Sequence, residues 1–342
     1  MDSDTEPVRN MLADVLDCYI GVSEGFLESH TNTFLLSLMF ALKKIPGIVY
    51  RYHNYQGVVL PALQLLARSA KKIVLVGSTQ PDCLNEFLEI CVSTFDMYQR
   101  WNSGKISSIP HDAEDEAYED IIALMDVVTH LSLSAESGAE SAGSTRACSR
   151  GLRVLLPLIT PPLLALPALA AHTYRMLRVL ERANQLTQLP IEDFNMVVSA
   201  LRVGLTAVSS DVSTVCCNII AGLADKQDIM AANNPYAMSL LTLAELLLML
   251  IIKMEMPADS IPAAGAAIYA LTCLKPALLE GLARQMIEAF AANDPANVPR
   301  LEEAFGILTN GVLFDGGRQH RIRFQDNFDK FLTSVHGFLI VK

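Results

Sequence analysis

A cluster of carboxylates is the first group of side chains in this sequence that could do chemistry. It contains Asp112, Glu114, Asp115, Glu116, Glu119 and Asp120, six acids within nine residues. Such a cluster can bind a basic segment of a partner protein. The same acids also suit a helix over 113–133, with Asp112 as its N-cap and negative charge at the positive end of the helix dipole. The two interpretations are compatible, and we treat all six as candidate partner-binding residues.

Residues 21–25 match G-x-S-x-G, the nucleophile motif of serine hydrolases. That chemistry requires a strand before the serine and a helix after it. The preceding segment, 11–20, instead has the apolar spacing of a helix. We therefore interpret 21–25 as the turn that ends a helix.

The remaining reactive side chains predict no catalytic site, metal site or cofactor site. The seven histidines are scattered, and none forms an HxxxH or HExxH pair with a third ligand nearby. Cys216 and Cys217 lie in an apolar helical stripe and are interpreted as core residues. The basic run formed by Arg318, His320, Arg321 and Arg323 is short, so a solvated helix start is favoured over a nucleic-acid site. We expect that the protein is not an enzyme.

Composition points to an acidic, helical protein in a reducing compartment. The net charge is −11, which argues against a nucleic-acid ligand and suits basic protein partners. The seven cysteines form no disulfide pattern, and the acidic start of the chain predicts no signal peptide.

An apolar periodicity typical of helices runs through the whole sequence. The predicted helices must position the side chains described above. Apolar residues recur every three or four positions in 84–98, 118–131, 194–205, 212–223 and 324–335. Helix pairs recur about every 40 residues, a period typical of HEAT and armadillo arrays. We expect the pairs 191–208 with 212–225, 258–274 with 276–292, and 297–309 with 319–338. The prediction is an all-α, HEAT/ARM-like superhelix over 1–342, divided into 1–136, a flexible loop at 137–144, and C-terminal repeats at 145–342.

Two apolar segments have the length of membrane spans. Residues 152–171 contain Pro161 and Pro162 in mid-span, which break a helix. Residues 236–254 carry Glu245 near their centre, and a lone carboxylate is costly in lipid. We expect no membrane insertion. A helical membrane protein is the least favoured of three hypotheses, and the other two are soluble helical-repeat proteins.

Several segments, taken in order, resemble the C-terminal part of the exportin-4 branch of the importin-β superfamily. They are 116–125, 155–158, 201–212 with Val215 and Cys216, 263–269, 324–332 and 337–342. The resemblance covers about 100–342; residues 1–100 match less closely, and 226–234 is shorter than the family's loop.

The resemblance implies a nuclear export receptor, or karyopherin, that moves between nucleus and cytoplasm. Its implied partners are protein cargo, Ran-GTP and the nucleoporins of the nuclear pore, with no nucleic acid. The family's main Ran-binding repeats precede the matched part, so we expect this chain alone to bind Ran-GTP weakly or not at all. The alternative is a stand-alone helical-repeat scaffold for protein complexes, without Ran dependence.

Overall fold

The protein is all-helical throughout the part that the computed structural model describes. That part comprises 5–25, 31–77, 79–102, 118–136, 142–230, 234–292 and 295–339. Every regular element in these ranges is a helix, and none is a strand, which confirms the predicted class. The helices form two compact units, Met1–Leu189 (unit 1) and Pro190–Lys342 (unit 2).

Unit 1 contains nine α-helices within the described ranges, together with short 3-10 turns. Its helices are α1 (Glu6–Glu24), α2 (Thr31–Leu42), α3 (Ile45–Arg51), α4 (Gln56–Val76), α5 (Pro81–Asn102), α7 (Glu119–Glu136), α8 (Ala142–Leu155), α9 (Pro161–Leu164) and α10 (Pro167–Arg182). The prolines expected to interrupt 152–171 do so: Pro161 begins α9 and Pro167 begins α10.

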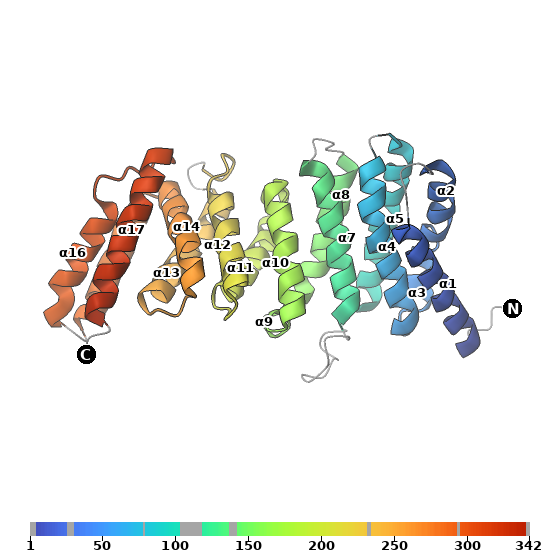
Figure 1. Ribbon diagram of the computed structural model, residues 1–342, viewed down its shortest axis with the longest axis horizontal. Helices are drawn as coiled ribbons and strands as arrows, with labels where there is room; N and C mark the ends of the chain where they lie inside the picture. Colours follow the sequence, from blue (N-terminus) through green and yellow to red (C-terminus); the bar gives the residue numbers. More distant parts are fainter. Residues whose placement is uncertain are drawn as a thin grey trace. The chain divides into compact units, whose positions relative to one another are not determined.

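The helices of unit 1 stack in two layers. In one layer α1 packs on α4, α4 on α7, and α7 on α10. In the other layer α3 packs on α5, and α5 on α8, while contacts between α7 and α8 join the layers. Figure 1 shows α4 and α7 running side by side, although α5 lies between them in the sequence. Layers made of alternate helices are typical of stacked helix pairs.

The expected division around 137–144 is wrong at its C-terminal edge. Residues 137–141 lie outside the described part, but Ala142, Gly143 and Ser144 form the first turn of α8. Because α8 packs on both α5 and α7, the segment before it joins two helices of the same unit. The boundary between the units instead falls between Leu189 and Pro190.

Unit 2 contains α11 (Ile191–Leu205), α12 (Ser210–Ala224), α13 (Pro235–Ile252), α14 (Ile261–Leu274), α15 (Ala277–Ala291), α16 (Val298–Thr309) and α17 (Arg318–Leu339). Again the layers consist of alternate helices: α12 packs on α14 and α14 on α17, while α11 packs on α13. Contacts of α11 with α12, and of α16 with α17, confirm two of the expected pairs.

In the third expected pair, 258–274 with 276–292, the two helices meet but are not each other's main partners. Helix α14 packs mainly on α12 and α13, so its partner precedes it in the chain. Helix α15 is amphipathic, yet Leu279 is its one buried residue. The sequence pattern located both helices, but it could not show which neighbour covers each apolar face.

An aromatic cluster fills the core between α14, α16 and α17. Phe324, Phe328 and Phe331 are fully buried on α17, and their rings stack in succession with centroids 6.1 and 6.3 Å apart. Phe305 of α16 meets Phe331, and Tyr269 of α14 meets Phe324. The spacing of this stripe, four residues and then three, predicted its burial from sequence.

Helix α13 is long and apolar enough to cross a membrane, with a mean hydropathy of 2.0 over 18 residues. The bent pair formed by 258–274 and 277–291 would pass the same test as one broken span. In the structure, 44% of the α13 window is buried by protein, and Glu245 is exposed. Core helices of soluble proteins commonly have these properties.

Candidate protein-binding groove

Of the acidic cluster, Glu119 and Asp120 lie in the described part of the chain. Asp112, Glu114, Asp115 and Glu116 lie outside the described residues. Glu119 is half-buried at the start of α7 and faces a cavity. Asp120 is only 2% exposed. The expectation that Asp120 meets a partner is therefore wrong, because its carboxylate is enclosed within the unit.

Asp120 instead holds a buried tyrosine. The Tyr98 hydroxyl of α5 donates a hydrogen bond to Asp120 Oδ2 at 2.9 Å, and the Ile121 amide donates to Oδ1 at 3.0 Å. Burial, and next the charge of Asp120, raise the pKa of Tyr98 well above its ordinary value. This carboxylate therefore fixes the start of α7 against α5.

We expect Asp120→Ala to lower the free energy of unfolding by about 1–3 kcal/mol, because Tyr98 loses an acceptor in a buried site. Glu119→Ala, which removes the neighbouring half-buried acid, is the matched control and should change stability by less than about 0.5 kcal/mol. Urea denaturation followed by Trp101 fluorescence measures both. Equal effects of the two substitutions would contradict the structural role of Asp120.

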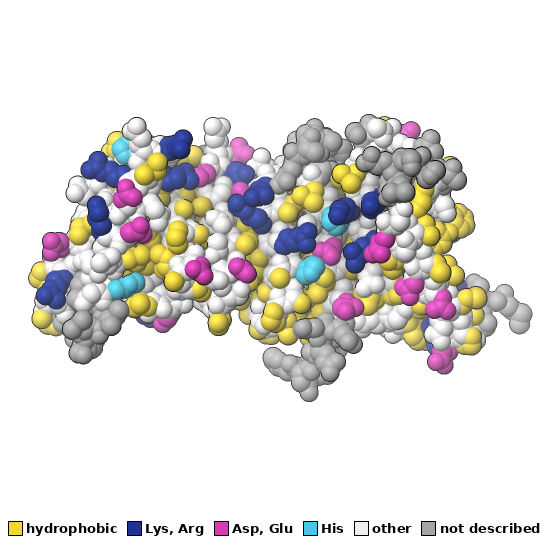
Figure 2. Space-filling model, viewed as in Figure 1, with side chains coloured by type: hydrophobic (Ala, Val, Ile, Leu, Met, Phe, Trp, Pro, Cys, Tyr) yellow, Lys and Arg dark blue, Asp and Glu magenta, His cyan; other side chains and the backbone are white. Residues whose placement is uncertain are grey.

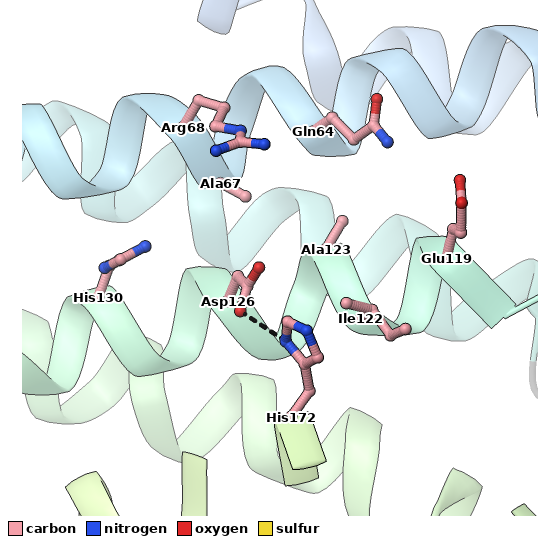
Figure 3. Close-up of a pocket in the computed structure, with 9 residues that line it drawn as sticks. All are labelled: Gln64, Ala67, Arg68, Glu119, Ile122, Ala123, Asp126, His130 and His172. Atoms are coloured by element: carbon pink, nitrogen blue, oxygen red, sulfur yellow. Dashed lines mark hydrogen bonds and ion pairs between the residues drawn. The ribbon is translucent and has the colours of Figure 1, made fainter. Parts of the chain in front are cut away.

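A groove lies over α7, between α4 and α10, and has a volume of about 420 Å³. Figure 3 shows its lining. The side chains are Gln64, Ala67 and Arg68 of α4; Glu119, Ile122, Ala123, Asp126 and His130 of α7; and His172 of α10. The α7 residues recur every three or four positions, so they form its outward stripe, and the flanking helices provide the walls. The groove lies entirely within unit 1.

The charges in the groove are unevenly distributed. Asp126 is held by His172, whose Nδ1 lies 3.0 Å from Asp126 Oδ1. His130, one turn further along α7, has a lowered pKa, first because it is partly buried and further because Arg175, Lys71 and Arg68 lie close. The nearby Asp126 charge acts in the opposite direction but does not outweigh these causes. Three cations and one carboxylate therefore act on His130 besides its burial.

Basic side chains gather around this end of the groove. Figure 2 shows Lys and Arg grouped around two histidines over α4, α7 and α10. Arg68 makes only a long contact, 3.7 Å, to Glu24, and both side chains are more than half exposed. Lys71 and Arg175 are exposed and pair with no carboxylate among the residues the structure describes. On a chain of net charge −11, this is a local reversal of sign.

The sequence interpretation missed these basic residues. On α10, His172, Arg175, Arg178 and Arg182 are spaced by three or four positions, which places them on one face of the helix. That spacing was a usable signal. Their approach to Arg68 and Lys71, however, depends on the packing of α4, α7 and α10, which lie about 100 residues apart at the extremes.

The G-x-S-x-G motif is the end of α1, as expected. Ser23 is buried and its hydroxyl donates to the Ile20 carbonyl at 2.7 Å, within the same helix. Gly25 caps the helix through its amide. The predicted helix-ending turn is confirmed.

Cys216 and Cys217 are fully buried free thiols in α12, which confirms their core position. Burial raises the pKa of Cys217 to about 12 and that of Cys216 well above its ordinary value. In unit 1, burial also raises the pKa of Cys148 to about 12. These thiols resist ionisation and are poor nucleophiles.

The raised thiol pKa values predict alkaline destabilisation. In the unfolded chain a thiol ionises above its ordinary pKa of about 9, whereas the folded chain keeps Cys217 protonated up to about 12. Stability is therefore complete below about pH 9 and is lost between about 9 and 12. From pH 8 to pH 10 each buried thiol should remove about 1 kcal/mol. Urea denaturation at both pH values should show a smaller loss for Cys217→Ala, and an unchanged loss for Cys18→Ala, which alters an exposed thiol.

The basic run at the start of α17 has partners within unit 2. Arg321 forms two contacts with the Asp225 carboxylate, at 3.0 and 3.1 Å. His320 Nδ1 accepts a hydrogen bond from the Leu313 amide at 3.2 Å. Two of its four basic side chains thus anchor the start of α17 instead of facing a ligand.

Within the described ranges, no three His, Cys, Asp or Glu side chains are grouped so as to hold a metal ion. A scan of the chain against models of protein families finds no match. In the described ranges the protein is therefore all-helical, with two layers of helices in each unit and a charged groove in unit 1.

Proposed function

We propose that this chain is a HEAT-like superhelix that binds other proteins, and that it forms the C-terminal part of an exportin-4-like nuclear export receptor. The observation that carries the proposal is the resemblance to that family, which runs in order from about residue 100 to 342. The stacking of alternate helices supports it, because such stacks present long surfaces to partner proteins.

In the proposed mechanism, Ran-GTP and protein cargo favour the same curvature of the superhelix. Each ligand then raises the affinity for the other by the same factor, and hydrolysis of GTP releases both. The receptor would carry cargo from nucleus to cytoplasm through contacts with nucleoporins. No cofactor is required by this mechanism.

The test is Ran-dependent capture of cargo. The complete reading frame that contains this sequence is expected to encode further helix pairs upstream of Met1. The protein it encodes, incubated with nuclear extract, should retain more cargo with Ran-GTP than with Ran-GDP. The chain alone should form no tight complex with purified Ran-GTP.

Two results would count against the receptor. Equal capture of partners with Ran-GTP and Ran-GDP would favour the Ran-independent scaffold. A reading frame that adds no helix pairs upstream would also point to a scaffold that acts alone.

A further inference from the structure

We propose that the groove between α4, α7 and α10 binds an acidic segment of a partner protein, with a carboxylate held between Arg68, Lys71 and Arg175. The inference rests on the proposed function only in taking the partner to be a protein, and it does not depend on Ran.

The first argument is charge complementarity. Arg68 lines the groove on α4, with Lys71 one turn further along that helix. Arg175 lies one turn beyond the lining residue His172 on α10. Like charges on the two helices that flank the groove repel each other, so an anion placed among them removes repulsion and adds attraction. Of the carboxylates close to this end, Asp126 is engaged by His172 at 3.0 Å, and Glu24 reaches Arg68 only at 3.7 Å. Among the described residues, Lys71 and Arg175 form no ion pair, and Arg68 forms only this long one.

The second argument concerns the groove itself. Its volume of about 420 Å³ accommodates several side chains of an extended segment. Ile122, Ala67 and Ala123 provide apolar lining, and Gln64 provides an amide that can bond a peptide backbone. His130 Nδ1 is buried and has no hydrogen-bond partner in the described part of the chain. Figure 3 shows Asp126 between the two histidines, with Arg68 on the opposite wall of the groove, on α4.

The same charges disfavour a nucleic acid. Glu119 and Asp126 lie in the groove, and the chain as a whole carries −11. A phosphate backbone would meet these acids at regular intervals, whereas a peptide can place one or two carboxylates at the basic end alone. Protein segments are therefore the better fit.

The test uses a fluorescein-labelled oligoglutamate peptide and the complete chain, with fluorescence anisotropy at low and physiological salt. The groove variant Arg68→Glu/Arg175→Glu should weaken binding at least about tenfold. The control variant Arg284→Glu/Arg300→Glu, which makes the same charge change at exposed sites in unit 2, should alter the Kd less than about twofold. Thermal unfolding of both variants checks that they fold, and Arg68→Gln/Arg175→Gln replaces the groove variant if it does not.

A second measurement locates the peptide. Carbodiimide coupling joins a glutamate carboxylate to a lysine amine in direct contact, and mass spectrometry should find the cross-link at Lys71 ahead of the exposed lysines of unit 2. Three results would overturn the proposal: no binding to the wild-type chain, equal weakening by both charge variants, or equal affinity for a single-stranded oligonucleotide. Each can occur while Ran-dependent cargo capture persists, so failure here is distinct from failure of the proposed function.

Discussion

Replacing Phe328 with alanine is expected to destabilise unit 2 by about 3–5 kcal/mol, the usual cost of removing a buried ring. Phe328 is fully buried and stacks between Phe324 and Phe331. Its ring also lies against α14, where a Cβ added to Gly265 would stand 2.8 Å from Phe328 Cδ1. The glycine therefore leaves space for the ring, and alanine at 328 leaves a cavity between α14 and α17.

Hydrogen–deuterium exchange read by mass spectrometry is the suitable measurement, because it reports unit 2 separately. Exchange should accelerate in α14 and α17, and the denaturation midpoint of unit 2 should fall. Leu313→Ala is the control, since Leu313 is 61% exposed and its loss should cost less than about 0.5 kcal/mol. If Phe328→Ala had an effect as small as the control's, the aromatic cluster would not be the core of this region.

Gly151→Ala is expected to destabilise unit 1, although alanine normally stabilises a helix interior by about 1 kcal/mol relative to glycine. Gly151 lies within α8, and a Cβ there would stand 2.5 Å from Val128 Cγ2 of α7 and 2.8 Å from Phe95 Cζ of α5. Overpacking of this kind costs about 1–3 kcal/mol. We therefore expect a net loss of up to about 2 kcal/mol, with the tertiary contact outweighing helix propensity.

A double-mutant cycle tests the cause. Val128→Ala removes the methyl group that the new Cβ would meet, so the double variant should be more stable than the sum of the single effects by about 1 kcal/mol. Gly21→Ala is the control because no atom lies within 4 Å of its added Cβ, and it should be neutral or stabilising. Additive effects of Gly151→Ala and Val128→Ala would show that α7 and α8 do not meet at this glycine.

Predictions from the sequence succeeded where they depended on local order. The end of α1 at Gly25, the α11–α12 pair and the aromatic stripe of α17 all follow from apolar spacing and from the residues that interrupt it. They failed where the environment of a side chain is set by another element. The sequence pattern places Asp120 in an acidic surface cluster. In the structure its carboxylate is buried and accepts a hydrogen bond from the Tyr98 hydroxyl of α5.

The sequence by itself determined that this protein is a succession of helices with a net negative charge, and that Cys216 and Cys217 belong to the core. Spacing of three and four residues is enough for that, because it fixes which side of each helix is apolar. Only the tertiary structure decided which helix covers each apolar side, as with α14, which packs on α12 and α13 more than on α15. It alone also brought Arg68, Lys71 and Arg175 around one histidine. The reason is that contacts between elements distant in the chain depend on how complete faces pack together, and no local pattern encodes that choice.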